Sequence, residues 1–476
     1  MTWIVLVALV VHIGTLIGNS ALLTNWDSDT YTMMAAGDAG DGAAPPGYPF
    51  FMRLVHGVWG SVDVLLLVQH LLLIAAGVAL YRAIRIFGGG RGVASVSAAA
   101  FMLCGQSLAI GQLVMTEALF LALMAFVILA LARLVRSLSL RDAAVLGLLL
   151  GVSATVRALG VPLLMLLCAG VFVLVLFLEQ DRWIGRARRG VLLTGLMVVS
   201  SVVGIAAVAV LGGTKEGLPV VGKSNSGWAM YGRVAQFADC PATYVRPGLR
   251  NLCPKEPEAA RYGPDYWRGI GGPALARFTW PPNGNPELSE FASAVIAHQP
   301  LDYLKATFVD TMRFFVPNFG RERPYSGRGW EEFDLSFRLD EPTTRHHEEV
   351  LESYYSPFTP RDHYLQAVTR YQEAFTLAPG IWTLLMLASL ASPFLVTGAR
   401  ARLICLMLVG SALALLVLAT AFNMYVARYA LPAMPFLLAC ASLAVQGLAA
   451  RIVRATPEPA PDPARRPGPD PEPEPA

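Results

Sequence analysis

The chain has 476 residues, of which 55% are hydrophobic and only 15% charged, and its mean hydropathy is +0.50. Soluble globular proteins carry about 25% charged residues, so this composition excludes that class and predicts a polytopic membrane protein. The formal net charge of +3 gives no reason to expect a nucleic-acid partner, and none is predicted.

Apolar runs of about 20 residues are long enough to cross a bilayer. The sequence contains ten of them, at 3–23, 62–82, 93–113, 117–134, 142–160, 161–178, 190–211, 379–397, 402–421 and 429–449. No basic segment precedes the first run, which continues at full length and therefore indicates a retained signal anchor. The expected fold is an all-α polytopic membrane protein with about ten transmembrane helices.

Fourteen of the arginines that flank these spans fall on one side of the membrane when the spans alternate. They are Arg82, Arg85, Arg91, Arg133, Arg136, Arg141, Arg182, Arg186, Arg188, Arg189, Arg400, Arg402, Arg451 and Arg454. Cytoplasmic loops carry the excess of Lys and Arg, so this side is predicted to be the cytosol, with both termini inside. The protein is therefore expected in the plasma membrane, as a multi-pass protein.

A long polar segment, residues 213–378, separates the seventh span from the eighth on the predicted outer side. It exceeds the length of an unstructured loop, so we expect a folded extracytoplasmic domain of mixed secondary structure. Cys240 and Cys253 lie within it and can form one disulfide in an oxidising compartment, or remain free thiols in the cytosol. Residues 301–316 place apolar side chains at helical spacing, a pattern typical of an interfacial amphipathic helix.

The predicted organisation has four parts. Residues 1–212 form a transmembrane module whose first outer loop is 24–61, and the extracytoplasmic domain 213–378 follows. The C-terminal helices occupy 379–450. The tail 451–476 is rich in Pro and Glu and cannot bury a core, so we expect it to be disordered and cytoplasmic.

Ionisable residues gather at the predicted outer ends of the spans. Asp27 and Asp29 follow the first span, Glu117 begins the fourth, Arg157 ends the fifth and Arg428 opens the tenth. Such groups are costly at membrane depth and usually have a partner or a function. Arginine binds phosphate oxygens through its planar fork, and an Asp can accept a proton from a hydroxyl, so the set indicates a site for a phosphate-bearing lipid substrate.

Each of these residues also has a plain structural explanation. Either aspartate can be a solvated loop residue, and Glu117 can complement the N-terminus of its helix. Arg157 and Arg428 can be lone arginines that extend toward the membrane surface. Three histidines of the long segment lack metal-ligand spacing and are expected to be solvated, namely His346, His347 and His363.

The order of short motifs resembles a known family. W-D-S-D-T-Y-T-M-M-A is followed by P-P-G-Y-P-F-F-M-R, and later come L-V-M-T-E-A-L-F, V-R-A-L-G-V-P and R-Y-A-L-P-A-M-P. This order resembles the GT-C superfamily of membrane glycosyltransferases. The matching branch contains the lipid A aminoarabinose transferases, the protein O-mannosyltransferases and related polyprenyl-phosphate-sugar transferases. The resemblance is clearest over residues 1–212.

The resemblance implies roles for particular residues. Asp27, four positions before Tyr31, matches the proposed catalytic base. The family often has a Glu directly after this Asp, but here Ser28 follows Asp27, so Asp29 is the candidate for the second carboxylate. Glu117 matches the acidic residue that supports the catalytic site or a metal ion. Arg157 and Arg428, with Tyr31 and Tyr429, match positions that contact the substrate or its lipid phosphate.

The implied activity is transfer of a sugar from a polyprenyl-phosphate donor to a glycan, lipid or protein acceptor on the extracytoplasmic face. No particular cofactor is predicted, although a divalent Mg or Mn ion held with Glu117 is compatible with the pattern. One alternative is a transporter or flippase of lipid-linked sugars, which needs polar residues along a path to the cytosol. The only hints of such a path are Gln69, His70, Gln106 and Gln112. A non-catalytic assembly partner is the second alternative.

Overall fold

The computed structural model describes residues 1–18, 26–37, 44–178, 183–212, 226–240, 244–269, 271–279, 283–316, 319–320, 324, 341–357 and 364–455. Every regular element within these ranges is helical, and they contain no strand. The expected all-α polytopic fold is confirmed.

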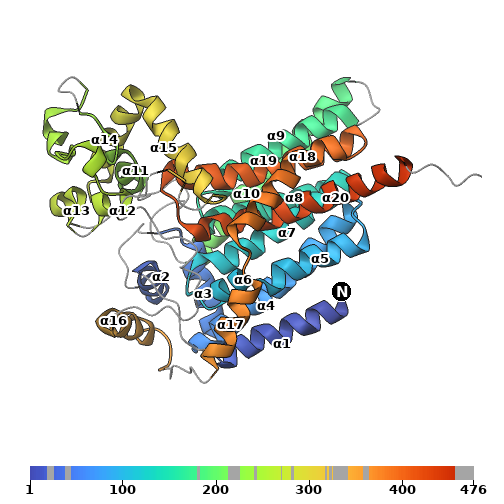
Figure 1. Ribbon diagram of the computed structural model, residues 1–476, viewed down its shortest axis with the longest axis horizontal. Helices are drawn as coiled ribbons and strands as arrows, with labels where there is room; N and C mark the ends of the chain where they lie inside the picture. Colours follow the sequence, from blue (N-terminus) through green and yellow to red (C-terminus); the bar gives the residue numbers. More distant parts are fainter. Residues whose placement is uncertain are drawn as a thin grey trace, which may run out of the picture.

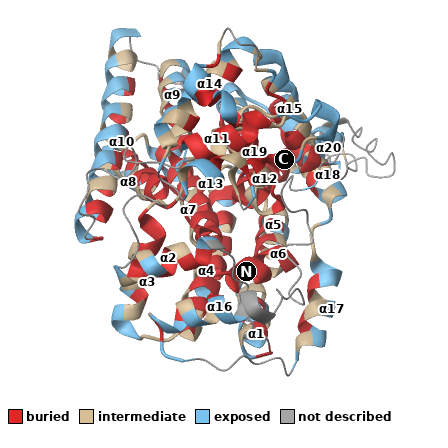
Figure 2. Ribbon diagram, turned by 90° about the vertical axis from the view of Figure 1, so that its left-hand side faces the viewer, coloured by how far each residue is buried: buried red, intermediate tan, exposed pale blue. Residues whose placement is uncertain are grey.

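The apolar helices, together with two short helices between them, pack side by side into one bundle (Figure 1). They are α1 (Thr2–Gly18), α4 (Val62–Ile86), α5 (Arg91–Leu103), α6 (Gly105–Gly111), α7 (Thr116–Ser137), α8 (Leu140–Val156), α9 (Gly160–Leu178), α10 (Trp183–Leu211), α18 (Pro379–Leu395), α19 (Ala399–Phe422), the 3-10 helix η4 (Ala427–Ala433) and α20 (Met434–Ala455). Buried residues concentrate along α4 and α7 (Figure 2), which makes α7 the centre of the bundle.

Each predicted span has a helix at its position, but the number of spans differs from the expectation. Seven helices of the described chain are long and apolar enough to cross a membrane, or eight if the bent pair α5–α6 counts as one span. The apolar α1 is shorter than these. The count of ten is therefore not confirmed.

The predicted third span, 93–113, is broken between α5 and α6, with a bend of 45°. Cys104 at the break has extended backbone angles, so the helical hydrogen bonds are interrupted there. Ser107 Oγ donates to the Phe101 carbonyl at 2.6 Å, and the Tyr371 hydroxyl donates to the Leu103 carbonyl at 2.9 Å. These bonds satisfy backbone groups that would otherwise be costly within the membrane.

Part of the long polar segment forms a small body with its own core. It contains α11 (Ser226–Ala235), η1 (Pro247–Leu252), η2 (Glu258–Ala260), α12 (Pro264–Arg268), α13 (Pro273–Phe278) and α14 (Asn285–His298). Trp228, Tyr231 and Trp267 are buried in this core. The described part of the segment is helical, so the mixed secondary structure expected of it is not found there.

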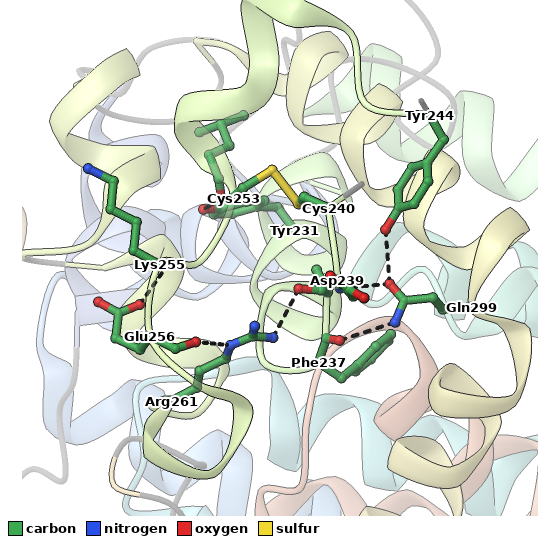
Figure 3. The surroundings of a disulfide bond; sticks show 12 residues. Tyr231, Phe237, Asp239, Cys240, Tyr244, Cys253, Lys255, Glu256, Arg261 and Gln299 are labelled. Carbon is green, nitrogen blue, oxygen red and sulfur yellow. Dashed lines mark hydrogen bonds between the residues drawn. A yellow bond between two sulfur atoms is a disulfide. The ribbon is translucent and has the colours of Figure 1, made fainter. Parts of the chain in front are cut away.

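A disulfide closes one loop of this body. Cys240 and Cys253 are bonded, with their Cα atoms 6.1 Å apart. Beside them Arg261 donates to the carbonyls of Ala238 at 3.0 Å and Glu256 at 2.9 Å (Figure 3). The side chain thereby links the two chain segments that flank the disulfide.

The remaining described helices of the segment attach to other parts of the protein. α15 (Pro300–Arg313) packs against α19, α16 (Glu341–Glu352) packs against α2, and α17 (Leu365–Phe375) packs against α6 and α1. These three helices therefore link the polar segment to the bundle and to the first outer loop.

Two short helices lie in the predicted first outer loop, α2 (Trp26–Ala36) and α3 (Gly47–Val58). Arg53 of α3 donates to the carbonyls of Met34 at 2.6 Å and Ala35 at 3.1 Å, and also to the Gly212 carbonyl at the end of α10. The last carbonyls of a helix lack partners within it, so this arginine both caps α2 and fixes its position.

Candidate active site

The centre of the site is a carboxylate held by two arginines. Glu117, in the first turn of α7, has a fully buried side chain, and its Oε1 lies 3.0 Å from Arg157 Nη2 and 3.1 Å from Arg428 Nε. The other oxygen, Oε2, accepts from the Thr116 hydroxyl at 3.3 Å. Three residues singled out in the sequence, from α7, from the turn before α9 and from η4, therefore meet at one point.

Tyr429 lies against both arginines. Its ring centroid is 5.0 Å from Arg157 Cζ and 5.6 Å from Arg428 Cζ, distances at which a guanidinium is attracted to an aromatic face. Asn423 Nδ2 donates to the Tyr429 hydroxyl at 3.1 Å. The ring is thus fixed at its outer end and helps to hold the two cations in place.

Asp27 joins this cluster at its open edge. Its Oδ2 lies 3.5 Å from Arg428 Nη2, and its side chain is 58% exposed. Tyr31, one turn further along α2, is buried and packs edge-on against Tyr48, with ring centroids 5.3 Å apart. Burial, followed by the charges of Asp27 and Glu117, raises the pKa of the Tyr31 hydroxyl well above its ordinary value, so this hydroxyl stays protonated.

Asp29 faces another way. Residues two apart on a helix do not share a face, and the carboxylate of Asp29 meets α16, where His347 Nδ1 is 2.7 Å from Oδ1 and 2.8 Å from Oδ2. His346 Nε2 lies 3.4 Å from Oδ2. The structure therefore does not bring Asp29 to the arginines.

The expectation of solvated histidines is wrong for His347, which is buried. Its partner is 318 residues away in the sequence, and no spacing rule could link the two. His346 is half exposed, and His363 lies outside the described residues.

A third arginine reaches the site from the small helical body. Arg268 of α12 donates to Asn423 Oδ1 at 2.7 Å and pairs with Asp265 Oδ1 at 2.7 Å. Burial disfavours its charge, but the charge of Asp265, with smaller contributions from Tyr429 and Asp27, raises its pKa above the ordinary value. Sequence reasoning missed Arg268, because the segment around it carries no motif.

The side chains around Glu117 are mainly the cations Arg157 and Arg428, and few other groups there could bind a metal. Among the described residues no group of three or more His, Cys, Asp or Glu side chains is arranged to hold one. The oxygens of Glu117 are directed at Arg157, Arg428 and Thr116. These surroundings suit an anion better than a divalent cation, and metal binding at Glu117 stays a prediction.

Comparison with known proteins gives one family match. Residues 43–205 match the family model of dolichyl-phosphate-mannose-protein mannosyltransferases. None of the curated proteins matches the chain. The chain is also similar to the solved structure of ArnT from Cupriavidus metallidurans bound to undecaprenyl phosphate, at 14% identity over 95% of this chain and 78% of that chain, with a TM-score of 0.35. A TM-score of this size does not establish a common fold.

The matched stretch contains Glu117 and Arg157, whereas Asp27, Asp29 and Arg428 lie outside it. The polytopic helices show independently that the chain is a multi-pass membrane protein. The match confirms the resemblance inferred from the sequence motifs, and it covers residues 43–205.

Proposed function

We propose that the protein transfers a sugar from a polyprenyl-phosphate donor to an acceptor outside the cytosol. The observation that carries this proposal is the buried Arg157–Glu117–Arg428 cluster with Asp27 at its open edge. The family that matches residues 43–205 is named for a sugar carried on a lipid phosphate, which supports a donor of this class.

The cluster is suited to bind the donor phosphate. Of the two carboxylates beside the guanidiniums, only that of Glu117 is fully buried, whereas Asp27 is 58% exposed and lies at the open edge. Arg157 and Arg428 side chains are 16% and 11% exposed, so an anion can reach them without entering the core. Within the described part of the chain, Arg157 Nη1 is buried and has no hydrogen-bond partner. A planar guanidinium offers two parallel donors to phosphate oxygens, and a buried donor without a partner is costly.

A groove for the lipid chain lies between α9 and α19. It has a volume of about 270 Å³ and is lined by Leu166, Ala169, Gly170, Val173, Leu403, Leu406, Met407 and Gly410. The turn with Arg157 precedes α9 and the segment with Arg428 follows α19. From Gly160 to Leu166 the helix rises about 9 Å, at 1.5 Å per residue. A polyprenyl chain whose phosphate is held by the arginines therefore reaches this groove.

The geometry supports a direct displacement. Asp27 accepts the proton of the acceptor hydroxyl, and the hydroxyl oxygen forms a bond to the anomeric carbon. The bond between that carbon and the phosphate oxygen breaks, and the phosphate leaves with the electron pair. Arg157 and Arg428 stabilise the charge that develops on it. Such a displacement inverts the anomeric centre.

The direct test is sugar transfer in membranes that contain either the wild type or Asp27→Asn. Radiolabelled polyprenyl-phosphate sugars serve as donors, and label is followed into glycan, lipid and protein fractions. We expect Asp27→Asn to lower transfer by about 10²–10⁴-fold, the usual contribution of a general base. Asp29→Asn, two residues along the same helix but outside the cluster, is the matched variant and should retain transfer in proportion to its abundance.

Two outcomes would overturn the proposal. Wild-type membranes that consume no donor would exclude the transferase. Transfer by Asp27→Asn at the wild-type rate would exclude Asp27 as the base. If Asp29→Asn alone abolished transfer at unchanged abundance, the second carboxylate would take that role.

The flippase alternative gains no support from the polar residues that suggested it. Gln69 Nε2 donates to the carbonyls of Gly111 at 3.0 Å and Leu113 at 2.9 Å. Gln106 Nε2 donates to the Leu377 carbonyl at 2.9 Å. These bonds join helices to one another, a common use of polar side chains in membrane bundles.

A further inference from the structure

α15 has its polar face turned inward and its apolar face turned outward. Thr307, Asp310, Thr311 and Arg313 are buried. On the opposite side Leu301, Leu304 and Phe308 are 78%, 60% and 57% exposed. A surface helix of a water-soluble body shows the reverse arrangement, with its apolar stripe toward the core.

The inward face cannot be exchanged for the outward one, because its polar groups are used. Asp310 Oδ2 lies 2.5 Å from Arg233 Nη1 of α11, and it also accepts from the Tyr425 backbone N–H at 3.3 Å. The hydroxyls of Thr311 and Thr420 are 2.8 Å apart, which joins α15 to α19. Rotation of the helix would bury the apolar face and break each of these bonds.

The apolar face also lies at the edge of the membrane-spanning bundle. Directly after α15, Phe314 and Phe315 pack into the same core as the spanning helices. The Thr383 hydroxyl of α18 donates to the Phe315 carbonyl at 2.9 Å, and Leu384 beside it is exposed on the outside of α18. Figure 1 shows α15 between the body of α11–α14 and the spanning helices. The exposed leucines of α15 therefore continue the lipid-facing surface of the bundle.

We propose that α15 is seated in the outer membrane–water interface and that Leu301, Leu304 and Phe308 contact lipid. Lys305, exposed on the same side of the helix, extends its ammonium group to the lipid head groups. The inward bonds then carry this anchoring to the site, because Asp310 holds Tyr425, three residues before Arg428. The lipid-facing role of α15 does not depend on the reaction that the protein catalyses.

The unmodified protein provides the first test. It is reconstituted into phosphatidylcholine vesicles that contain a phospholipid with a photoactivatable diazirine in its acyl chain, irradiated and digested with trypsin. We expect lipid adducts on the peptide that follows Lys305 and ends at Arg313, with Phe308 as a modified residue. Lipid adducts on α18 around Leu384 are the positive control, and α14 around Glu287 and Glu290 is the negative control. Adducts on α18 with none on α15 would overturn the proposal.

A fluorescence measurement gives a second, independent readout. The four thiols outside the disulfide (Cys104, Cys168, Cys405 and Cys440) are replaced by Ala, and bimane is attached to Phe308→Cys or, as the matched control, to Glu287→Cys. We expect lipids with a doxyl group near the head group to quench the label at position 308, and aqueous iodide to quench the label at 287. Quenching of position 308 by iodide and not by the lipid would show an open or protein-covered face and refute lipid contact. If the variants with replaced cysteines fail to fold, the adducts on the unmodified protein decide.

Discussion

Removal of the central carboxylate charge tests the electrostatic structure of the site most directly. In Glu117→Gln the two guanidiniums of Arg157 and Arg428 lose the charge that lies 3.0 and 3.1 Å from them. Breaking a buried ion pair at one partner typically costs about 3–5 kcal/mol. Gln keeps an oxygen that accepts from one arginine, so we expect a loss at the lower end, about 3 kcal/mol.

The same change should strengthen binding of a lipid phosphate. The pocket keeps both cations and loses the competing anion, so polyprenyl phosphate replaces the missing charge. We expect roughly tenfold tighter binding than in the wild type, equivalent to about 1.4 kcal/mol. A ligand that binds only the folded protein stabilises it in proportion to the logarithm of its concentration over Kd. Polyprenyl phosphate should therefore restore a large part of the stability that the variant has lost.

Thermal unfolding of both proteins in nanodiscs, with and without polyprenyl phosphate, measures these two effects. Neutral polyprenol, which has the same chain without the phosphate, is the control for occupation of the groove. A variant as stable as the wild type would contradict the ion cluster. A variant that is less stable, but gains no more from polyprenyl phosphate than the wild type does, would contradict the assignment of the arginines to phosphate.

Three further predictions concern the two aspartates, the disulfide and Arg268. Asp29→Asn should lower stability by about 1.5–3 kcal/mol, because a buried charged hydrogen bond is lost. Asp27→Asn should cost less than about 1 kcal/mol, as is usual for exposed pairs. Thermal unfolding of the two variants distinguishes these losses. Replacing Cys240 and Cys253 by Ser should destabilise the small helical body by about 2–4 kcal/mol, seen as faster limited proteolysis. Arg268→Met should raise the KM for the donor by about tenfold. Arg268 holds Asn423, and the hydrogen bond from Asn423 that orients the Tyr429 ring beside the cations weakens when Arg268 is removed. Equal unfolding temperatures, unchanged proteolysis or an unchanged KM would contradict these expectations in turn.

The sequence predicted those features that depend on local composition. Apolar runs located the helices, because spanning a membrane requires about 20 such residues regardless of their neighbours. Glu117, Arg157 and Arg428 stood out because charges at the ends of apolar runs are rare. The break at Cys104 was not predictable, since it depends on bonds from Ser107 and from Tyr371 of a distant helix.

Residues whose roles depend on tertiary contacts escaped sequence reasoning. The residue pattern alone does not separate Asp27 from Asp29, and only the family resemblance favours Asp27. In the structure Asp29 contacts the buried His347 of α16, whereas Asp27 contacts Arg428 at the open edge of the cluster. Arg268 lies in a segment with no recognisable pattern, and its approach to Asn423 depends on how the small body sits on the bundle. The two contacts join polar side chains that are 318 and 155 residues apart in the sequence, separations at which no periodicity exists.

The two carboxylates of the cluster differ in how strongly they are bound to the arginines, and this difference sets the order in which donor and acceptor bind. Glu117 is fully buried and contacts two guanidiniums, whereas Asp27 is 58% exposed and its ion pair with Arg428 spans 3.5 Å. An arriving phosphate therefore displaces Asp27 from Arg428 in preference to Glu117, because the exposed pair is the weaker one. Once displaced, Asp27 is available to an acceptor hydroxyl. We thus expect the donor to bind before the acceptor, with the base becoming competent only when the sugar phosphate is in place.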